Sequence, residues 1–219
     1  MMAMILAAGH GERMRPLTES TPKAMLEVAG TPLIDRQLAM LARAGVDTVV
    51  INLGRLGEQI VEHVGGGQRY GLQVAYSPEY EHILDSGGGI RRALPLLGDA
   101  PFWVVNADIY TDLSLSDIDV DARSKAHLVL VPTPPYKEVG DFALRDGKVR
   151  NGDVRDLTYC GVWRCDPAFL AGTEEGRFSI VPMWRDAADR GELTGTFYGG
   201  VWEDIGTPER LAMVNERFG

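Results

Sequence analysis

The sequence lacks the features that mark secreted, zinc-binding or membrane-spanning proteins. Its 219 residues include only two cysteines, Cys160 and Cys165, too few for the disulfide framework of a small secreted domain. Without neighbouring Cys or His partners, the pair is also a poor zinc site. No apolar run approaches the 18 or so residues of a transmembrane helix, and no basic residue precedes the apolar start, as it would in a signal peptide. These absences predict a cytoplasmic protein without a membrane partner.

An excess of positive charge is also missing. The chain carries 22 Lys and Arg against 31 Asp and Glu, a net charge of −9, which argues against nucleic acid as a partner. A phosphate-bearing small ligand is still possible, because it needs only local cations. The length is enough for one sizeable core, so residues 1–219 are predicted to form a single domain.

Short apolar segments alternate with helical patterns along the chain. Strands are expected at 3–7, 46–52, 72–76, 102–105, 128–131, 157–164 and 196–202, with a hairpin over 142–149 that turns at Asp146-Gly147. Helices are expected at 32–44, 56–64, 88–97, 180–189 and 208–218. This order predicts an α/β fold, a Rossmann-like single domain whose mostly parallel mixed sheet is flanked by helices. Ligands of such folds bind at the carboxyl ends of the strands.

A long loop is expected after the first strand, over 8–30, and it contains the strongest functional pattern. Gly9 and Gly11 let the backbone approach a phosphate closely, and Arg13, Arg15 and Lys23 place cations around the same loop. A Walker A loop is excluded because no Gly-Lys-Ser/Thr follows, and the dinucleotide fingerprint lacks its third glycine. The glycine pair alone is equally compatible with a structural turn.

Three further segments, each next to a predicted strand or helix, contain candidate functional residues. They are Asp85-Ser-Gly-Gly-Gly-Ile90, Val104-Val-Asn-Ala-Asp108 and Trp202-Glu-Asp-Ile-Gly-Thr-Pro208. The glycines allow close backbone approach to a base or sugar, and a carboxylate at the end of a strand suits a metal ion. Taken alone, each also fits a structural explanation, such as a flexible helix entry or a turn aspartate.

Together these motifs resemble the sugar nucleotidyltransferases. The pattern GxGxRMxPLTxxxPK, from Gly9 to Lys23, is continued by VxGxPLI from Val28 to Ile34, and the resemblance extends over nearly the whole chain. It implies the nucleotide-diphospho-sugar transferase type of fold. The implied nucleotide-binding residues are Ala8, Gly9, Gly11, Arg13, Lys23, Gly87, Gly88 and Asn106, with Arg13 and Lys23 catalytic. The implied ligands of a Mg²⁺ cofactor are Asp108 and Asp204, and the sugar-binding candidates are Asn106, Gly140, Asp153 and Tyr159.

The sequence departs from the family pattern at two places. Asp85-Ser86 replaces Glu-Thr, which leaves the base preference open. The E-K-P motif, whose lysine grips the sugar phosphate, is absent; Lys148, Arg150 or Arg155 could substitute, or Lys23 and the metal could suffice.

The resemblance implies an NTP and a sugar 1-phosphate as partners, in a monomer or small homo-oligomer. The resemblance in stretches such as Ser77-Pro-Glu-Tyr-Glu81 and Gly140-Asp-Phe-Ala-Leu144 implies UTP and N-acetylmuramic acid 1-phosphate as the substrates. Another base, another sugar or an alcohol phosphate remains an alternative. So does a non-catalytic regulatory module, although it would be expected to lose the charged residues. A metal-dependent glycosyltransferase is a further alternative. It would need the two carboxylates of a D-x-D motif, and Asn106-Ala-Asp108 has only one.

Overall fold

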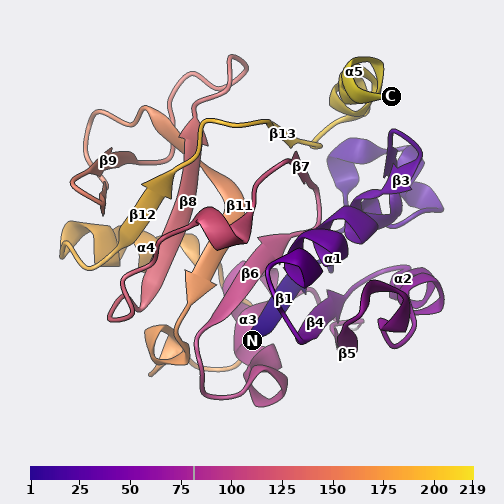
Figure 1. Cartoon of the computed structure of the whole chain (residues 1–219), viewed down its shortest axis with the longest axis horizontal. Coiled ribbons are helices and arrows are strands. Elements are labelled where there is room, and N and C mark those ends of the chain that lie inside the picture. Colours follow the sequence, from indigo (N-terminus) through magenta and orange to yellow (C-terminus); the bar gives the residue numbers. More distant parts are fainter. Residues whose placement is uncertain (81) are drawn as a thin grey trace.

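A computed structural model describes residues 1–80 and 82–219, so Glu81 lies outside the described residues. Its centre is a nine-stranded mixed sheet in the order β5-β4-β1-β6-β11-β8-β12-β10-β9 (Figure 1). The strands of this sheet are β1 Met2–Leu6, β4 Thr48–Leu53, β5 Gln73–Pro78, β6 Phe102–Asn106, β8 Ala126–Pro132, β9 Ala143–Arg145, β10 Lys148–Arg150, β11 Leu157–Cys165 and β12 Thr194–Phe197.

Seven of the nine strands run in the same direction. The N-terminal block β5-β4-β1-β6 is parallel throughout, and only β11 and β10 run the opposite way. Strand β11 joins the N-terminal block to the C-terminal strands because it pairs with β6 on one side and β8 on the other. The predicted α/β fold with a mostly parallel mixed sheet is therefore confirmed.

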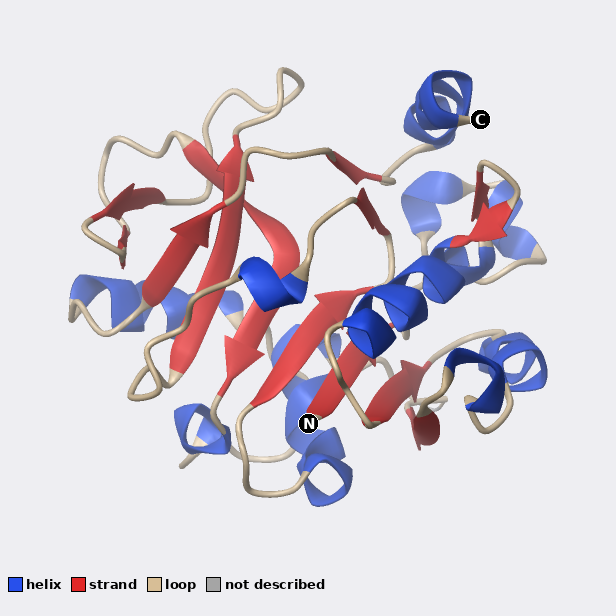
Figure 2. Cartoon of the chain, viewed as in Figure 1, coloured by secondary structure: helices blue, strands red, loops and turns tan. Residues whose placement is uncertain are grey.

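Helices cover both faces of this sheet (Figure 2). The helices of the described residues are α1 Leu33–Arg43, α2 Gly57–Val64, α3 Asp85–Leu97, α4 Val181–Asp189 and α5 Pro208–Phe218. Successive residues of β1 point to opposite faces: Ala3 and Ile5 pack in the core that includes α1 and α2, and Met4 packs in the core with α3 and α4. The parallel strands are therefore packed against an apolar core on each face of the sheet.

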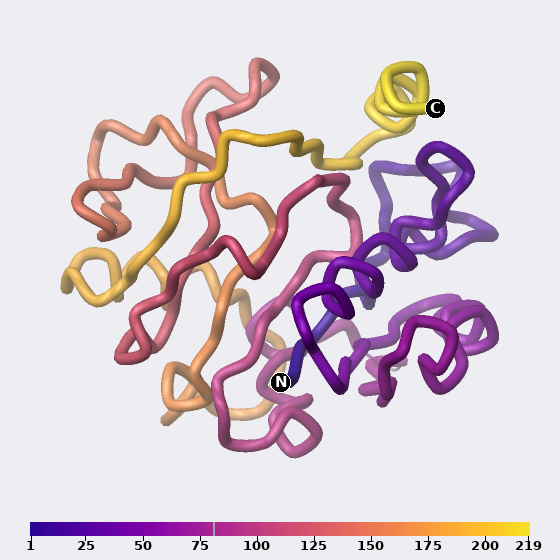
Figure 3. The backbone as a smooth tube through the Cα atoms, in the orientation of Figure 1, coloured from indigo at the N-terminus to yellow at the C-terminus, as the bar shows by residue number. Residues whose placement is uncertain are grey.

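The C-terminal helix lies beside the N-terminal loop region. In Figure 3 the yellow end of the chain runs next to the indigo segment that follows β1. Asn215 of α5 accepts a hydrogen bond from the backbone N–H of Ala29 at 2.8 Å and donates to the carbonyl of Glu27 at 3.2 Å. Helix α5 begins as expected, with the Thr207 hydroxyl accepting from the Arg210 N–H. Hydrogen bonds thus connect the C-terminal helix to the end of the N-terminal loop region.

Two predicted elements differ from the structure. The strand expected at 196–202 is divided into β12 and a separate β13, Trp202–Asp204, because β12 pairs with β8 whereas β13 pairs with β7, Ile109–Thr111. The expected loop over 8–30 contains three short 3-10 helices and the strand β2, Glu27–Val28, which pairs with β3, Thr31–Pro32, just after it. Across the described residues, no helix combines the length and apolarity that crossing a membrane requires.

Candidate active site

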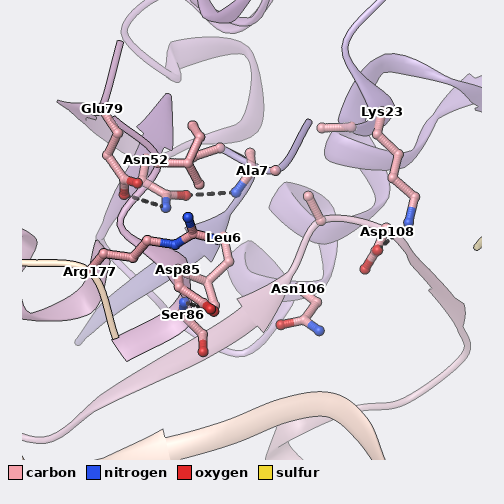
Figure 4. A pocket seen from close by; sticks show the side chains of 15 residues that line it. Leu6, Ala7, Lys23, Asn52, Glu79, Asp85, Ser86, Asn106, Asp108 and Arg177 are labelled. Carbon is pink, nitrogen blue, oxygen red and sulfur yellow. Dashed lines mark hydrogen bonds and ion pairs between the residues drawn. The ribbon is translucent and has the colours of Figure 1, made fainter. Parts of the chain in front are cut away.

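A first cavity of about 280 Å³ opens where β1 and β6 end. Ala8 and Gly9 of the N-terminal loop line it, together with Lys23 and Asn106. Figure 4 shows Lys23 reaching toward Asp108 on one side, with Arg177, Asp85 and Ser86 on the other. The cavity therefore lies at the carboxyl ends of parallel strands, where an α/β sheet is expected to bind its ligand.

A buried hydrogen-bond network fixes the floor of this cavity. The side-chain oxygen of Asn52 accepts from the Ala7 N–H at 2.7 Å, and its amide donates to Glu79 at 2.8 Å (Figure 4). The second oxygen of Glu79 accepts from the Leu84 N–H at 2.8 Å. Asn52 and Glu79 are only 3% and 2% exposed. One asparagine thus connects the start of the glycine loop to the segment that leads into α3.

The predicted glycine cluster lies inside the first turns of α3. A Cβ on Gly87 would meet the Phe178 ring at 2.3 Å, and one on Gly88 would meet the Gly176 carbonyl oxygen at 2.1 Å. These glycines allow α3 to contact the 176–178 segment closely, and neither is among the residues lining the cavity. Asp85 and Ser86, which directly precede these glycines, do line it, and Asp85 has a positive φ of 63°. Sequence reasoning had treated Asp85-Ser86 only as a variation in the motif.

A second cavity, of about 450 Å³, adjoins the first and shares Asn106 and Asp108 with it. Its wall combines loop 133–141, strand β11 and the start of α5. Its lining residues are Arg13, Asn106, Asp108, Ile109, Pro134, Tyr136, Lys137, Asp141, Thr158, Tyr159, Cys160, Gly161, Trp202, Asp204 and Arg210. Two cavities that meet at one carboxylate can hold two reactants side by side, with their reacting groups at the junction.

The two predicted metal ligands are brought together by the β7-β13 ladder. Asp204 is paired with Ile109, and the Ile205 N–H donates to the Asp108 carbonyl at 3.0 Å. Both carboxylates line the second cavity. Asp108 forms an ion pair with Lys23, and Asp204 accepts from Arg210 Nη1 at 2.7 Å. Two convergent carboxylates suit Mg²⁺, which usually takes one or two protein carboxylates and completes its shell with water and phosphate oxygens.

The remaining predicted residues are distributed unevenly around the two cavities. Gly11 lines neither cavity; its φ of +62° and the hydrogen bond from the Thr18 hydroxyl to its carbonyl at 2.8 Å shape the loop. Gly140 precedes the lining residue Asp141, and its Cβ position is filled by Thr133 and Leu157 atoms. Asp153 is exposed in the 151–156 loop and lines neither cavity.

The cations proposed to replace the E-K-P lysine are not in the second cavity. Lys148 and Arg150 belong to β10, near the far edge of the sheet, and Arg155 is also absent from the lining residues. Lys137 and Arg210, which sequence reasoning did not select, line the cavity instead. No local motif marks them, since each becomes a cavity residue only when its loop or helix docks against β11 or β13.

Tyr159 lines the second cavity but packs mainly against aromatic residues. Its ring lies 4.7 Å from that of Trp184, centroid to centroid. Burial, with smaller effects from Cys160 and Asp108, raises the pKa of the Tyr159 hydroxyl well above its ordinary value. The hydroxyl is buried without a hydrogen-bond partner in the described protein. The phenol of Tyr159 is therefore neutral and packed beside Trp184 rather than exposed in the cavity.

The chain belongs to the nucleotidyl transferase family, whose model matches residues 2–153. It is an enzyme of the nucleotidyltransferase class, as the resemblance implied.

Two relatives are similar over nearly their whole length, and both are N-acetylmuramate alpha-1-phosphate uridylyltransferases. The protein from Neisseria meningitidis is 45% identical, covering 96% of this chain and 95% of its own. The protein from Caulobacter vibrioides is 37% identical, covering 99% and 96%.

Solved structures share the fold at low identity. A putative glucose-1-phosphate thymidylyltransferase from Bacillus anthracis, in complex with a sucrose, matches with a TM-score of 0.85 at 20% identity over 99% of this chain and 95% of its own. HddC from Yersinia pseudotuberculosis, complexed with GMP-PN, matches with a TM-score of 0.79 at 22% identity over 100% and 99%.

Proposed function

We propose that this enzyme transfers the uridylyl group of UTP to N-acetylmuramic acid 1-phosphate and releases pyrophosphate. The observation that carries the proposal is the pair of cavities that meet at Asp108. The substrates are suggested by the relative from Neisseria meningitidis, which is 45% identical over nearly the full length of both chains. The cavity that contains the glycine loop would hold UTP, and the cavity beside β11 would hold the sugar phosphate.

In the proposed reaction, an oxygen of the sugar phosphate attacks the α-phosphorus of UTP, and the bond to the pyrophosphate oxygen breaks. The attacking phosphate is already a dianion near neutral pH, so no general base is needed. The protein must instead align the two anions and offset their charge. We assign this task to Lys23, at the junction of the cavities, and to Arg13, which lines the second cavity. Ala8 and Gly9 would contact the nucleotide through their backbone.

Asp108 and Asp204 are the residues that would hold Mg²⁺. Bound there, the ion would act as a Lewis acid that neutralises phosphate charge. The two carboxylates are now neutralised by Lys23 and Arg210. If the carboxylates held a metal instead, Lys23 and Arg210 would be available to the anionic substrates. Asn106, shared by the two cavities, is proposed to donate to a substrate oxygen near their junction.

We also propose that residues 1–219 act as one domain, since the sheet that carries the first cavity continues into the strands of the second. The proposed sugar is a component of peptidoglycan, and UTP is an intracellular metabolite. These substrates support a cytoplasmic role in peptidoglycan recycling.

The test is pyrophosphate release by the purified protein with Mg²⁺, using five nucleotides (UTP, dTTP, CTP, GTP and ATP) against N-acetylmuramic acid 1-phosphate and a panel of hexose 1-phosphates. We expect release that requires both a nucleotide and a sugar phosphate, with UTP and the muramic substrate as the best pair. A better pair with another base or sugar would replace the proposed substrates while keeping the enzyme class.

A further inference from the structure

The proposed sugar substrate carries a second anion in addition to its phosphate, the carboxylate of its lactyl ether. The following inference rests on the proposed function, because it concerns how that carboxylate is recognised. Among the described residues, three cations line the second cavity: Arg13, Lys137 and Arg210. The three cations have different neighbours. These neighbours indicate which cation can bind a substrate carboxylate that lies away from the reacting phosphate.

Arg210 is held at the metal side of the cavity. Its Nη1 donates to Asp204 at 2.7 Å, and its guanidinium carbon lies 3.5 Å from the centroid of the Tyr136 ring. Arg13 belongs to the glycine loop, and a Cβ built on Gly206 would lie 3.5 Å from its Nη2 and 3.0 Å from an Asp204 carboxylate oxygen. Both arginines therefore lie beside Asp204, where the phosphates are expected.

Lys137 lies in a different part of the same cavity. Its ammonium contacts Asp141 Oδ1 at 2.5 Å, and the other oxygen of Asp141 accepts from the Tyr159 N–H at 3.0 Å. Asp141 is thus fixed to β11 through the backbone and holds the lysine in turn. An ammonium has three N–H donors, and its one contact within residues 1–80 and 82–219, with Asp141, leaves two of them for a ligand. The Lys137 side chain is 34% exposed, so a ligand can reach it.

Lys137 and the junction of the cavities lie beside different residues of strand β11. A Cβ on Gly161 would lie 3.2 Å from the Asn106 Cβ, which places Gly161 at the junction. Tyr159, whose N–H donates to Asp141, comes two residues before Gly161 in an irregular part of β11, so the chain separates the two by at most about 7 Å. This separation is comparable with the width of a pyranose ring. A sugar whose phosphate lies at the junction can therefore direct its far side toward Lys137.

We propose that Lys137 binds the lactyl carboxylate of the sugar substrate, and that Asp141 positions the lysine for it. Lys137 would then select the muramic sugar over N-acetylglucosamine 1-phosphate, which has the same ring and phosphate but a hydroxyl in place of the lactyl ether. The competing role for Lys137 is to bind the phosphate, in place of the missing E-K-P lysine. The two roles differ in their effect on a substrate that has the phosphate and lacks the carboxylate.

The experiment measures kcat/KM with UTP for N-acetylmuramic acid 1-phosphate, its lactyl carboxamide and N-acetylglucosamine 1-phosphate, at high enzyme concentration. Lys137→Met should lower kcat/KM for the muramic acid about 10- to 100-fold, the usual worth of a hydrogen bond to a charged group. It should change kcat/KM less than about twofold for the two analogues that lack the carboxylate. Lys137→Arg should restore much of the preference for the acid, because it keeps the charge.

Lys125→Met is the matched control, since Lys125 is exposed and lines a different cavity; it should behave as the wild type with all three substrates. An unchanged value for the muramic acid in Lys137→Met would overturn the proposal. An equal loss with all three substrates would also overturn it, and would assign Lys137 to the phosphate. If the wild type used none of the three sugars with UTP but used another pair, the proposed function itself would fail, which is a separate result.

Discussion

The Asn52–Glu79 pair beneath the first cavity allows a sharp test of the structure. Asn52→Asp changes one NH2 group to an oxygen without changing the size of the side chain. The new carboxyl could still accept from the Ala7 N–H, but it would face Glu79 across the 2.8 Å that the amide donor now spans. Both side chains are at most 3% exposed. Two carboxylates this close cannot both be ionised, so the pair should retain one proton.

The magnitude follows from the cost of keeping that proton. A carboxyl group has an ordinary pKa of about 4, so holding it protonated at pH 7 costs about 4 kcal/mol. At pH 5 the same proton costs only about 1.4 kcal/mol. Since the folded variant binds more protons than the unfolded chain, its stability must fall as pH rises. The destabilisation of Asn52→Asp relative to the wild type should therefore be about 4 kcal/mol at pH 7 and about 1.4 kcal/mol at pH 5.

The assay is urea unfolding followed by tryptophan fluorescence at both pH values, with the wild type measured alongside. Asn151→Asp is a matched control, because Asn151 also lies beside an acid, Asp189, but is partly exposed and accepts from Arg185. Solvent and the arginine should limit its effect to under about 1 kcal/mol at either pH. Equal stability of Asn52→Asp and the wild type at pH 7, or a destabilisation that does not shrink at pH 5, would refute the buried contact.

Three further predictions concern catalysis, backbone strain and pH. Lys23→Met and Asp108→Asn should each lower kcat for pyrophosphate release by about 10²- to 10³-fold while leaving the thermal unfolding transition cooperative; near-normal rates would contradict the site. Gly161→Ala should cost about 1–3 kcal/mol in urea unfolding, because its φ is +91° and its Cβ would approach Ile109 to 2.7 Å; an unchanged midpoint would count against this backbone. Burial, with a smaller effect of a nearby arginine, lowers the pKa of His127 to about 4, so the unfolded chain binds more protons between pH 4 and 6.5. Stability should fall by about 2 kcal/mol between pH 7 and pH 5, and His127→Gln should remove that dependence.

The local elements of the fold could be predicted because the periodicity of the sequence matches their burial. In β1, Ala3 and Ile5 face one core while Met4 faces the other, which produces a continuous apolar run. Helix α5 was predicted with its bounds because Thr207 and Pro208 mark its start. The expected strand at 196–202 was wrong as a single element, because its two halves pair with different strands far away in the chain.

Some site residues could be predicted from contiguous sequence motifs, whereas others could be found only in the folded structure. The sequence alone determined the family, and it predicted the glycine loop and the carboxylates Asp108 and Asp204 as site residues, because contiguous motifs carry them. Tertiary structure alone decided that Asn52 and Glu79 form the floor of one cavity and that Lys137 and Arg210 line the other. Asn52, Lys137 and Arg210 belong to no local pattern, and the stretch Ser77–Glu81 that contains Glu79 does not mark it as a cavity residue. The physical reason is that their partners are Ala7, Asp141 and Asp204, whose proximity follows from strand pairing and from the docking of α5.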